Sequence, residues 1–291
     1  DKNQVWRPEY FYKFFYKQMN KTVGGEINYT FRIRPLRDFK WVVGGRMQEK
    51  YTYNSYYFTS TNEPWNIVTT FSSTDLTLGF KFAFREKILQ TTKGQVSLGS
   101  KFPVVWFNYT RGVKGLLNGE YVFNRFDLKI NFDYFFKYFG ESRFVMKAGI
   151  IDGQLPISNL YSGVGSYSKF TVYAPSSFGT MGADEFYSDR YISLFLSHNF
   201  KDLLFSLGNY KPELMLVTNI AFGSLKNPND HHNIKFETLE NGYYESGIII
   251  RKLLNLQIYD LGAGVLYRYG PYGNNAPSKN FAYKISLYYT F

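Results

Sequence analysis

The chain has 291 residues, enough for one large domain or one barrel. Aromatic residues make up 21% of it while the mean hydropathy is only -0.31, a combination typical of strands with one apolar and one polar face. The absence of cysteine excludes a disulfide framework and a thiolate metal site. Since no stretch reaches the roughly 18 apolar residues of a transmembrane helix, any membrane spans must be strands.

The formal net charge is +11 and the pI is near 9.4. A basic protein can bind nucleic acid. Here, however, the Lys and Arg residues are spread through alternating segments and form no single cluster, so we expect no nucleic-acid partner. Exposed basic residues could face the phosphates of lipopolysaccharide in an outer membrane. For any single residue, an ordinary solvated charge in a loop or lumen is the simpler interpretation.

Residues 1–20 show no clean period of two. Their aromatic part, residues 9–16, is compatible with a short helix, a plug-like element or the end of a lipid-facing strand. The segment does not have the pattern of a signal peptide, so we expect a mature chain, a truncated one or part of a longer protein.

From residue 26 onward, most segments alternate between apolar and polar side chains, as strands with two different faces do. These segments are residues 26–34, 40–53, 76–85, 103–111, 122–138, 143–152, 187–200, 214–222, 243–251, 256–269 and 279–291. Single-chain bacterial barrels have an even number of strands, so we predict about twelve. The additional strand would come from residues 6–19 or from before residue 1.

The clearest alternation is in residues 122–138, where Phe126, Leu128 and Phe132 share one face. Strands of soluble sandwiches average about five or six residues. Several runs here are longer, and their apolar positions carry aromatic residues more than Val or Ile. We therefore predict an all-β, antiparallel, up-and-down transmembrane β-barrel formed by residues 1–291, possibly the C-terminal part of a larger barrel.

Charged side chains on the polar face would have to point into the lumen of such a barrel. The predicted lumen-facing residues are Glu26, Arg32, Arg34, Lys81, Arg85, Arg125, Asp127, Lys129, Asp133, Arg268 and Lys284. They could line a pore that selects solutes by charge. They could also form an ion-paired network that fills a narrow barrel or contacts a plug, and the mixture of signs favours this network.

Residues 153–184 interrupt the alternation. They are rich in Gly, Ser and Pro and contain no long alternating run. We expect one long loop on a single side of the barrel.

The sequence Asp230-His231-His232 is the only histidine cluster. Adjacent residues of a strand point to opposite faces, and no carboxylate lies at a spacing that would complete a zinc site. We therefore expect an exposed loop there, with no metal and no cofactor.

His198 lies near Asp189 and Glu185 in the sequence and could act as a general base. A paired nucleophile is not visible, because Ser193 and Ser197 are ordinary strand serines and the chain has no Gly-x-Ser-x-Gly motif. We find no catalytic set and predict a protein that is not an enzyme.

The last segment, residues 279–291, ends on an aromatic residue. Its apolar face consists of Tyr283, Ile285, Leu287, Tyr289 and Phe291. This strand resembles the C-terminal insertion signal of bacterial outer-membrane barrels, which the barrel assembly machinery of that membrane reads. The last strand of a soluble antiparallel sheet would be the alternative.

Several stretches together resemble one protein family. They are residues 102–115, 185–195, 240–247 and 264–272, the last containing Tyr-Arg-Tyr-Gly-Pro-Tyr. The resemblance is to a Bacteroidota outer-membrane family of unknown function with an N-terminal carboxypeptidase-regulatory-like domain and a C-terminal barrel, this chain matching the barrel part. It implies an outer-membrane location and contacts with other envelope proteins, and it brings no catalytic residues.

These observations predict an integral outer-membrane barrel that acts as a structural or assembly component of a larger envelope complex. One alternative is a channel or transporter for small solutes. A second alternative is a barrel hydrolase that uses His198 or the pair His231 and His232.

Overall fold

The computed structural model describes residues 21–33, 38–51, 56–60, 63–68, 70–92, 94–205, 208, 210–256 and 259–289. All structural statements concern these residues. The predicted N-terminal segment 1–20, Arg34 and Phe291 lie outside them, as does the side chain of Tyr289.

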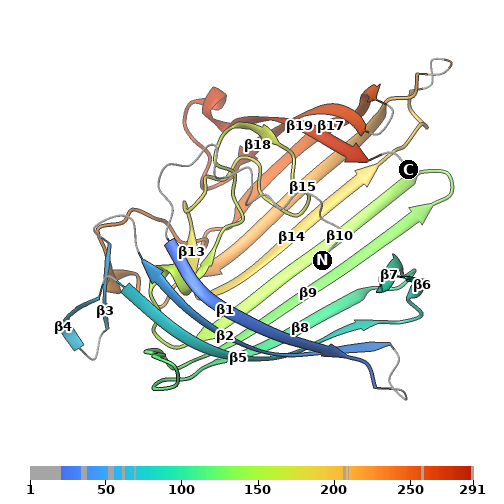
Figure 1. Cartoon of the computed structure of the whole chain (residues 1–291). Helices are drawn as coiled ribbons and strands as arrows, with labels where there is room; N and C mark the ends of the chain where they lie inside the picture. Colours follow the sequence, from blue (N-terminus) through green and yellow to red (C-terminus); the bar gives the residue numbers. More distant parts are fainter. Residues whose placement is uncertain are drawn as a thin grey trace.

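One large curved sheet forms the body of the molecule (Figure 1). In spatial order its twelve strands are β1 (Lys21–Phe31), β2 (Phe39–Tyr51), β5 (Thr70–Ala83), β8 (Val104–Gly112), β9 (Phe123–Phe136), β10 (Gly140–Asp152), β14 (Arg190–Asn199), β15 (Glu213–Ser224), β17 (Tyr243–Leu256), β18 (Tyr259–Tyr269), β19 (Phe281–Tyr289) and β12 (Phe170–Val172). The strands from β1 to β19 follow chain order and pair antiparallel with their neighbours. The predicted all-β, up-and-down architecture of about twelve strands is therefore confirmed.

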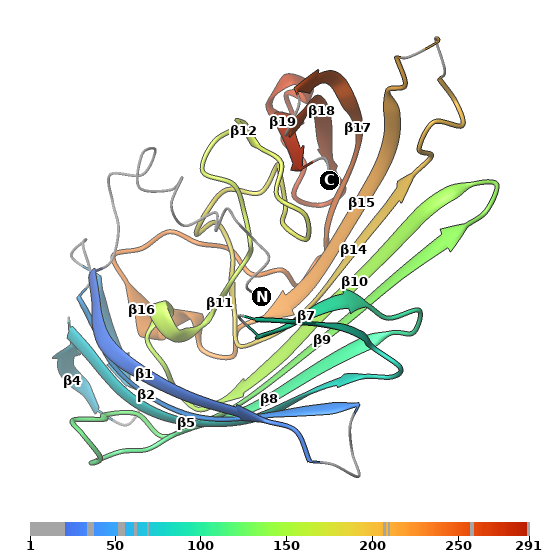
Figure 2. The same cartoon turned by 45° about the vertical axis from the view of Figure 1, so that its right-hand side comes forward.

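The sheet is not closed in the part of the chain that the structure describes. Its outer edges are β1 and β12, and these two strands do not pair with each other. β12 belongs to residues 153–184, which the sequence predicted to be a loop, and it runs parallel to β19 from Phe170↔Tyr283 to Val172↔Ile285. The edge of β19 is thus partly occupied by a segment of the same chain (Figure 2).

Smaller elements lie outside this sheet. β3 (Tyr57–Ser60), β4 (Glu63–Val68) and β16 (His231–His232) form a three-stranded sheet, β6 (Lys87–Thr91) pairs with β7 (Gly94–Gly99), and β11 (Tyr161–Ser162) pairs with β13 (Tyr187–Ser188). Three short 3-10 helices complete the described structure: η2 (Ile157–Asn159), η3 (Pro228–Asp230) and η4 (Pro277–Asn280). Within the described ranges, no helix is long and apolar enough to cross a membrane.

The alternation of side chains gives the sheet two different faces. On β19, Lys284 and Ser286 are 3% and 0% exposed, whereas Tyr283 and Leu287 are 56% and 40% exposed. The buried side chains point to the concave, inner face and the exposed apolar ones to the convex, outer face. The core of the molecule consequently lies inside the curve. One hydrophobic cluster contains Phe71 and another contains Tyr243, and both include residues of segments that lie outside the large sheet.

The two ends of the sheet carry different connections. Residues 113–122, 153–189, 225–242 and 270–280 connect strands at one end, which we call the loop end. Residues 137–139 and 200–212 connect strands at the other, the turn end, where β19 also ends and the β6–β7 hairpin lies. The turn at residues 137–139 leads into Gly140, whose φ of 101° and close approach to the Asn199 carbonyl require glycine.

Candidate functional site

Residues 153–184 fold back onto the concave face of the sheet, and we call them the inner loop (Figure 2). Glycines in the inner loop allow its backbone to lie close to the strands of the sheet. A Cβ at Gly179 would lie 2.4 Å from Leu266 Cδ1 and 2.9 Å from Lys284 Cε, so a larger residue would not fit without displacing the loop. The composition that predicted a loop therefore also explains how its backbone can lie against the strands.

Glu245 on β17 is the deepest anchor of the inner loop. It is 0% exposed. Its carboxylate accepts hydrogen bonds from the backbone N–H groups of Gly179 and Thr180, both at 2.9 Å, and from the Thr180 hydroxyl at 2.5 Å. Asn219 on β15 donates a further bond at 2.6 Å. A buried carboxylate with four donors is well satisfied, and three of the donors belong to the inner loop.

Arg268 and Lys284 hold the same region from the next two strands. Arg268 on β18 forms an ion pair with Glu185, just beyond the inner loop, at 2.7 Å. Lys284 on β19 donates to Ser166 Oγ at 2.9 Å and to Thr171 Oγ1 at 2.6 Å. Both side chains belong to the predicted lumen-facing set, and the structure places both on the inner face against segments inside the curve.

The first part of the inner loop is held by strands on the opposite side of the curve. Lys50 on β2 donates to the Ser158 carbonyl oxygen at 2.5 Å. The Tyr161 hydroxyl donates to Asp127 at 2.8 Å, while the Arg125 guanidinium lies 4.2 Å from the centre of the Tyr161 ring. The predicted pair Arg125 and Asp127, itself bridged at 2.9 Å, thus contacts the inner loop.

Lys147 on β10 adds a further contact by donating to the Ser176 carbonyl oxygen at 2.9 Å. Strands β2, β9, β10, β17 and β19 therefore all reach the inner loop with polar side chains. Three of these residues were not predicted from the sequence: Lys50, Lys147 and Glu245. The signal for Glu245 was a single carboxylate at an inner-face position of a mainly apolar strand.

The remaining predicted lumen residues lie away from the inner loop. Asp133 pairs with Arg143 at 2.7 Å, and Glu86 pairs with Lys81 at 2.5 Å and with Arg32 at 3.1 Å. These contacts are the mixed-sign pairing that the sequence favoured.

Two predicted residues have other surroundings. Glu26 is exposed on the edge strand β1, where Asn28 donates to it. Arg85 does not lie in a strand, because β5 ends at Ala83 and the chain turns with φ of 50° at Arg85, whose guanidinium lies over the Phe84 ring. The alternation continued in the sequence beyond the point where the backbone leaves the sheet.

A row of lysines crosses the inner face of five neighbouring strands. In register, Lys40 is opposite Lys81, Lys81 opposite Trp106, Trp106 opposite Lys129, and Lys129 opposite Lys147. The amino groups of Lys81 and Lys129 lie 5.6 and 4.9 Å from the centre of the Trp106 ring. Like charges directly opposite each other are unfavourable, and cation–π contacts offset part of this cost.

The histidine pair does not form the exposed loop that we expected. His231 is only 9% exposed, and its Nδ1 lies 2.9 Å from the Tyr56 hydroxyl, which also accepts a bond from the Ile157 N–H. His232 Nε2 lies 3.0 Å from Thr59 Oγ1. Burial, with a contribution from His232, lowers the pKa of His231 to about 4. The pair is buried because β16 pairs with β3, which is far away in the sequence.

Among the described residues, neither histidine region is part of a group that could hold a metal ion. Within the described ranges no group of three or more His, Asp or Glu residues could hold a metal ion. His198 lies at the opposite end of β14 from Asp189, and its ring nitrogens contact Ser142 Oγ at 2.8 Å and the Phe139 carbonyl oxygen at 2.9 Å. Because the carbonyl only accepts, Nε2 donates to it and Nδ1 accepts from Ser142.

The predicted insertion signal occupies β19. Tyr283 and Leu287 are exposed on the outer face and Ile285 is half-buried, with the inner-facing residues between them buried. The outer face is thus apolar along the strand that ends the described chain.

A curved antiparallel sheet with an apolar outer face, and with a polar inner face that binds its own loop, defines a protein of the β-barrel class. The model for the C-terminal domain of a family of unknown function, DUF5686, matches residues 16–236, and the chain belongs to this family.

The solved structures show the same fold. BamA from Haemophilus ducreyi, in a crystal structure lacking POTRA domains 1–3, is similar with a TM-score of 0.54 and 12% sequence identity. The similarity covers 92% of this chain and 55% of that chain, so this chain spans about half the length of the BamA chain. Among curated proteins, no sequence matches.

Proposed function

We propose that this chain is an integral outer-membrane β-barrel that acts as a structural or assembly component of a larger envelope complex and is not an enzyme. The apolar outer face, with Tyr283, Leu287 and Ile248 exposed, suits contact with lipid. The BamA-like fold and the family membership support the same location. Short turns of such barrels are periplasmic and long loops extracellular, which orients the turn end towards the periplasm.

The observation that carries this proposal is the anchoring of the inner loop. A passive pore needs a continuous aqueous lumen, whereas Glu245, Lys284 and Lys147 hold the inner loop across the concave face. These contacts include a fully buried carboxylate, so the loop is part of the packed structure. If the interior is filled, the surfaces left for other envelope proteins are the loops, the turn end and the sheet edges. The barrel assembly machinery would be one such partner during insertion.

Purification from native outer membranes tests the proposal. The tagged full-length protein would be extracted in mild detergent and its companions identified by mass spectrometry. We expect a stoichiometric set of envelope proteins. A protein that is purified alone, and whose tagged form still supports growth like the untagged one, would contradict the proposal.

A second candidate function, a gated channel for small anions, is favoured by the lysine row. Lys81, Lys129 and Lys147 would attract anions into the lumen if the inner loop moved away. Planar-bilayer recordings separate the two functions. We expect no steady conductance from the wild-type chain. Conductance would appear only when residues 166–181 are replaced by a Gly-Ser linker. A wild-type chain with steady, anion-selective conductance would favour the channel.

A further inference from the structure

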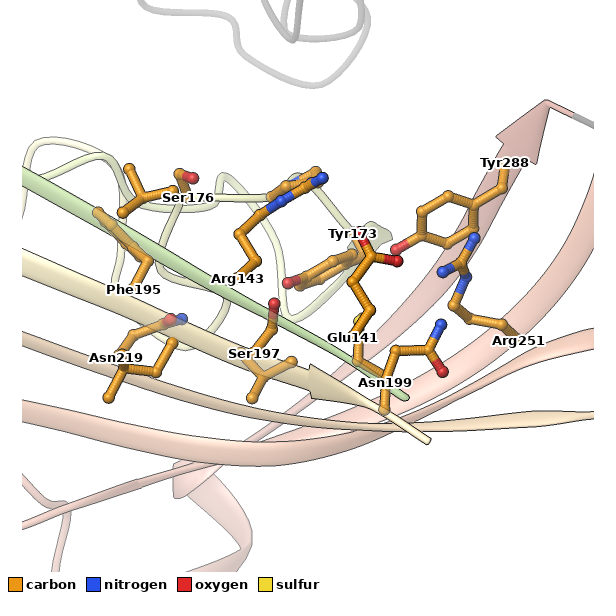
Figure 3. Close-up of a pocket in the computed structure, with 15 residues that line it drawn as sticks. Glu141, Arg143, Tyr173, Ser176, Phe195, Ser197, Asn199, Asn219, Arg251 and Tyr288 are labelled. Atoms are coloured by element: carbon orange, nitrogen blue, oxygen red, sulfur yellow. The ribbon is translucent and has the colours of Figure 1, made fainter. Parts of the chain in front are cut away.

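A cavity of about 60 Å³ opens on the inner face at the turn end (Figure 3). Apolar side chains such as Val145, Phe195 and Met215 line one part of it. Arg143 and Arg251 line another part, together with the inner-loop residue Tyr173. The cavity is therefore built jointly by the strands and by the inner loop. Its charged lining consists of the two guanidinium groups and the carboxylate of Glu141.

The ion pairs around this cavity contain one more cation than carboxylate. They are Arg143 with Asp133 at 2.7 Å, Lys201 with Glu141 at 2.7 Å, Lys252 with Glu213 at 2.6 Å and Arg251 with Glu213 at 3.5 Å. Four cations thus face three carboxylates. One additional negative charge would complete the network.

Arg251 is the cation with the weakest pairing. Glu213 already accepts hydrogen bonds from Lys252 and, at 2.6 Å, from Asn199, and its distance to Arg251 is the longest of the set. The Nε of Arg251 is buried and has no hydrogen-bond partner in the described part of the chain. A buried N–H without an acceptor costs free energy, so the protein satisfies this guanidinium only in part.

The ring of Tyr288 fixes the position of this guanidinium. The Arg251 Cζ lies 3.5 Å from the ring centre, which is the distance of a stacked cation–π contact. Stacking uses the face of the guanidinium and leaves its N–H edge available for an oxyanion. Figure 3 shows Arg251 beside Tyr288, with Glu141 and Asn199 close by.

Three hydroxyl groups add neutral donors. Tyr173, Ser197 and Tyr288 all line the cavity. Within the described residues, none of these hydroxyls has a hydrogen-bond partner on the protein, although each could donate one bond to a bound acceptor. The carboxylate of Glu141 also lines the cavity but is paired with Lys201 at 2.7 Å. The unpaired hydroxyls and the underpaired guanidinium therefore form a donor set without an acceptor of their own.

We propose that this cavity binds one small oxyanion, a carboxylate or phosphate group, through Arg251 and the hydroxyls of Tyr173, Ser197 and Tyr288. Guanidinium groups match the geometry of both anions. Roughly 10–15 Å³ of this kind of volume holds one water, so a cavity of about 60 Å³ has room for one such group. This site goes beyond the proposed envelope role. The proposal does not depend on which partner proteins the chain has.

Isothermal titration calorimetry on the purified full chain in detergent micelles tests the site. The probes are inorganic phosphate, acetate and N-acetylglycine, with chloride holding the ionic strength constant and N-acetylglycinamide as the uncharged control. We expect saturable 1:1 binding of at least one anion and none of the amide. Binding of phosphate alone would identify a phosphate group, and binding of N-acetylglycine would identify the carboxylate of a peptide. The absence of saturable binding for every anion would overturn the proposal.

Two variants connect the binding to the cavity. Arg251→Gln should weaken it about tenfold or more, because it removes a charged donor. Lys211→Gln removes the same charge at an exposed position of the turn end, 52% exposed as a side chain, and should leave the affinity within about twofold. Equal losses in both variants would mean nonspecific attraction to a basic surface and would contradict the site.

Folding of each variant is checked by the difference between boiled and unboiled samples in gels. If Arg251→Gln does not fold, Tyr288→Phe and Ser197→Ala replace it, since each removes one hydroxyl and little packing. Their combination should weaken anion binding about tenfold, whereas unchanged affinity in the folded double variant would reject the proposed donors.

Discussion

The inner faces of β17 to β19 and of β2 follow the same alternating pattern but differ in exposure. Glu245, Lys284 and Arg268 are 0%, 3% and 7% exposed. On the other side, the Arg46 side chain is 41% exposed although it pairs with Asp75 at 2.7 Å. The sheet pattern alone does not determine burial. The inner loop contributes to the difference, because it supplies partners to Glu245 and Lys284. On β2 it reaches Lys50, while Arg46 pairs with Asp75 within the sheet.

The largest effect on stability should come from Glu245, the fully buried residue that binds the inner loop. Glu245→Ala leaves the N–H groups of Gly179 and Thr180 without their acceptor, and we expect a loss of about 3 kcal/mol or more in the free energy of unfolding. Limited proteolysis should then cut within residues 153–184. The matched control is Glu240→Ala at an exposed position, for which we expect a wild-type digestion pattern. A resistant inner loop in Glu245→Ala would mean that other contacts hold it.

The outer face of the sheet provides the second test, since substitutions there should have different effects from substitutions on the inner face. Phe132 lies opposite Phe144 on the outer face of β9, and Lys129 is on the inner face of the same strand. Phe132→Arg should cost about 2–4 kcal/mol near the midplane of a bilayer, whereas Lys129→Ala should cost less. Urea unfolding in lipid vesicles measures both. If both positions tolerate substitution equally, the assignment of the two faces is wrong.

Much of this comparison could be predicted from the sequence, because a side-chain period of two reports the faces of each strand directly. The strand that contains Phe132 and the strand that ends the chain were both predicted in this way. The partners could not be predicted. Glu245 and Thr180 are 65 residues apart, His231 and Tyr56 are 175 apart, and neither separation leaves a local pattern. The three residues of β12 are too few to show any period.

The pH dependence tests the loop-end contact between β3 and β16. His231 has a folded pKa of about 4 against an ordinary value of 6.5, so the folded state disfavours its protonation. The unfolded chain takes up this proton first, and the free energy of unfolding should fall by up to about 3 kcal/mol as the pH decreases from 6.5 to 4. The loss should be complete near pH 4 and absent above pH 7.

The difference between wild type and His231→Gln isolates this contribution. Glutamine keeps a polar contact with Tyr56 but does not titrate, so its unfolding curves should be flatter over the same pH range. Groups that do not interact with His231 are the same in both proteins and cancel in the difference. Parallel curves for the two proteins would show that His231 is protonated as easily in the folded state as in the unfolded one.

The smallest effect should separate two lysines of the same inner face. Lys284 is buried and donates to three oxygens, those of Ser166, Ser168 and Thr171. Lys284→Met removes these bonds but also removes the cost of burying a charge, so we expect a net loss of only about 1 kcal/mol. Lys40→Met, at an exposed position on β2, should change the free energy of unfolding by less than about 0.5 kcal/mol. If Lys284→Met stabilises the protein, the buried ammonium is a net cost in the folded state. In that case we would assign Lys284 to fixing the register of the inner loop against β19, because Lys284 is opposite Thr171 in the parallel pairing of β12.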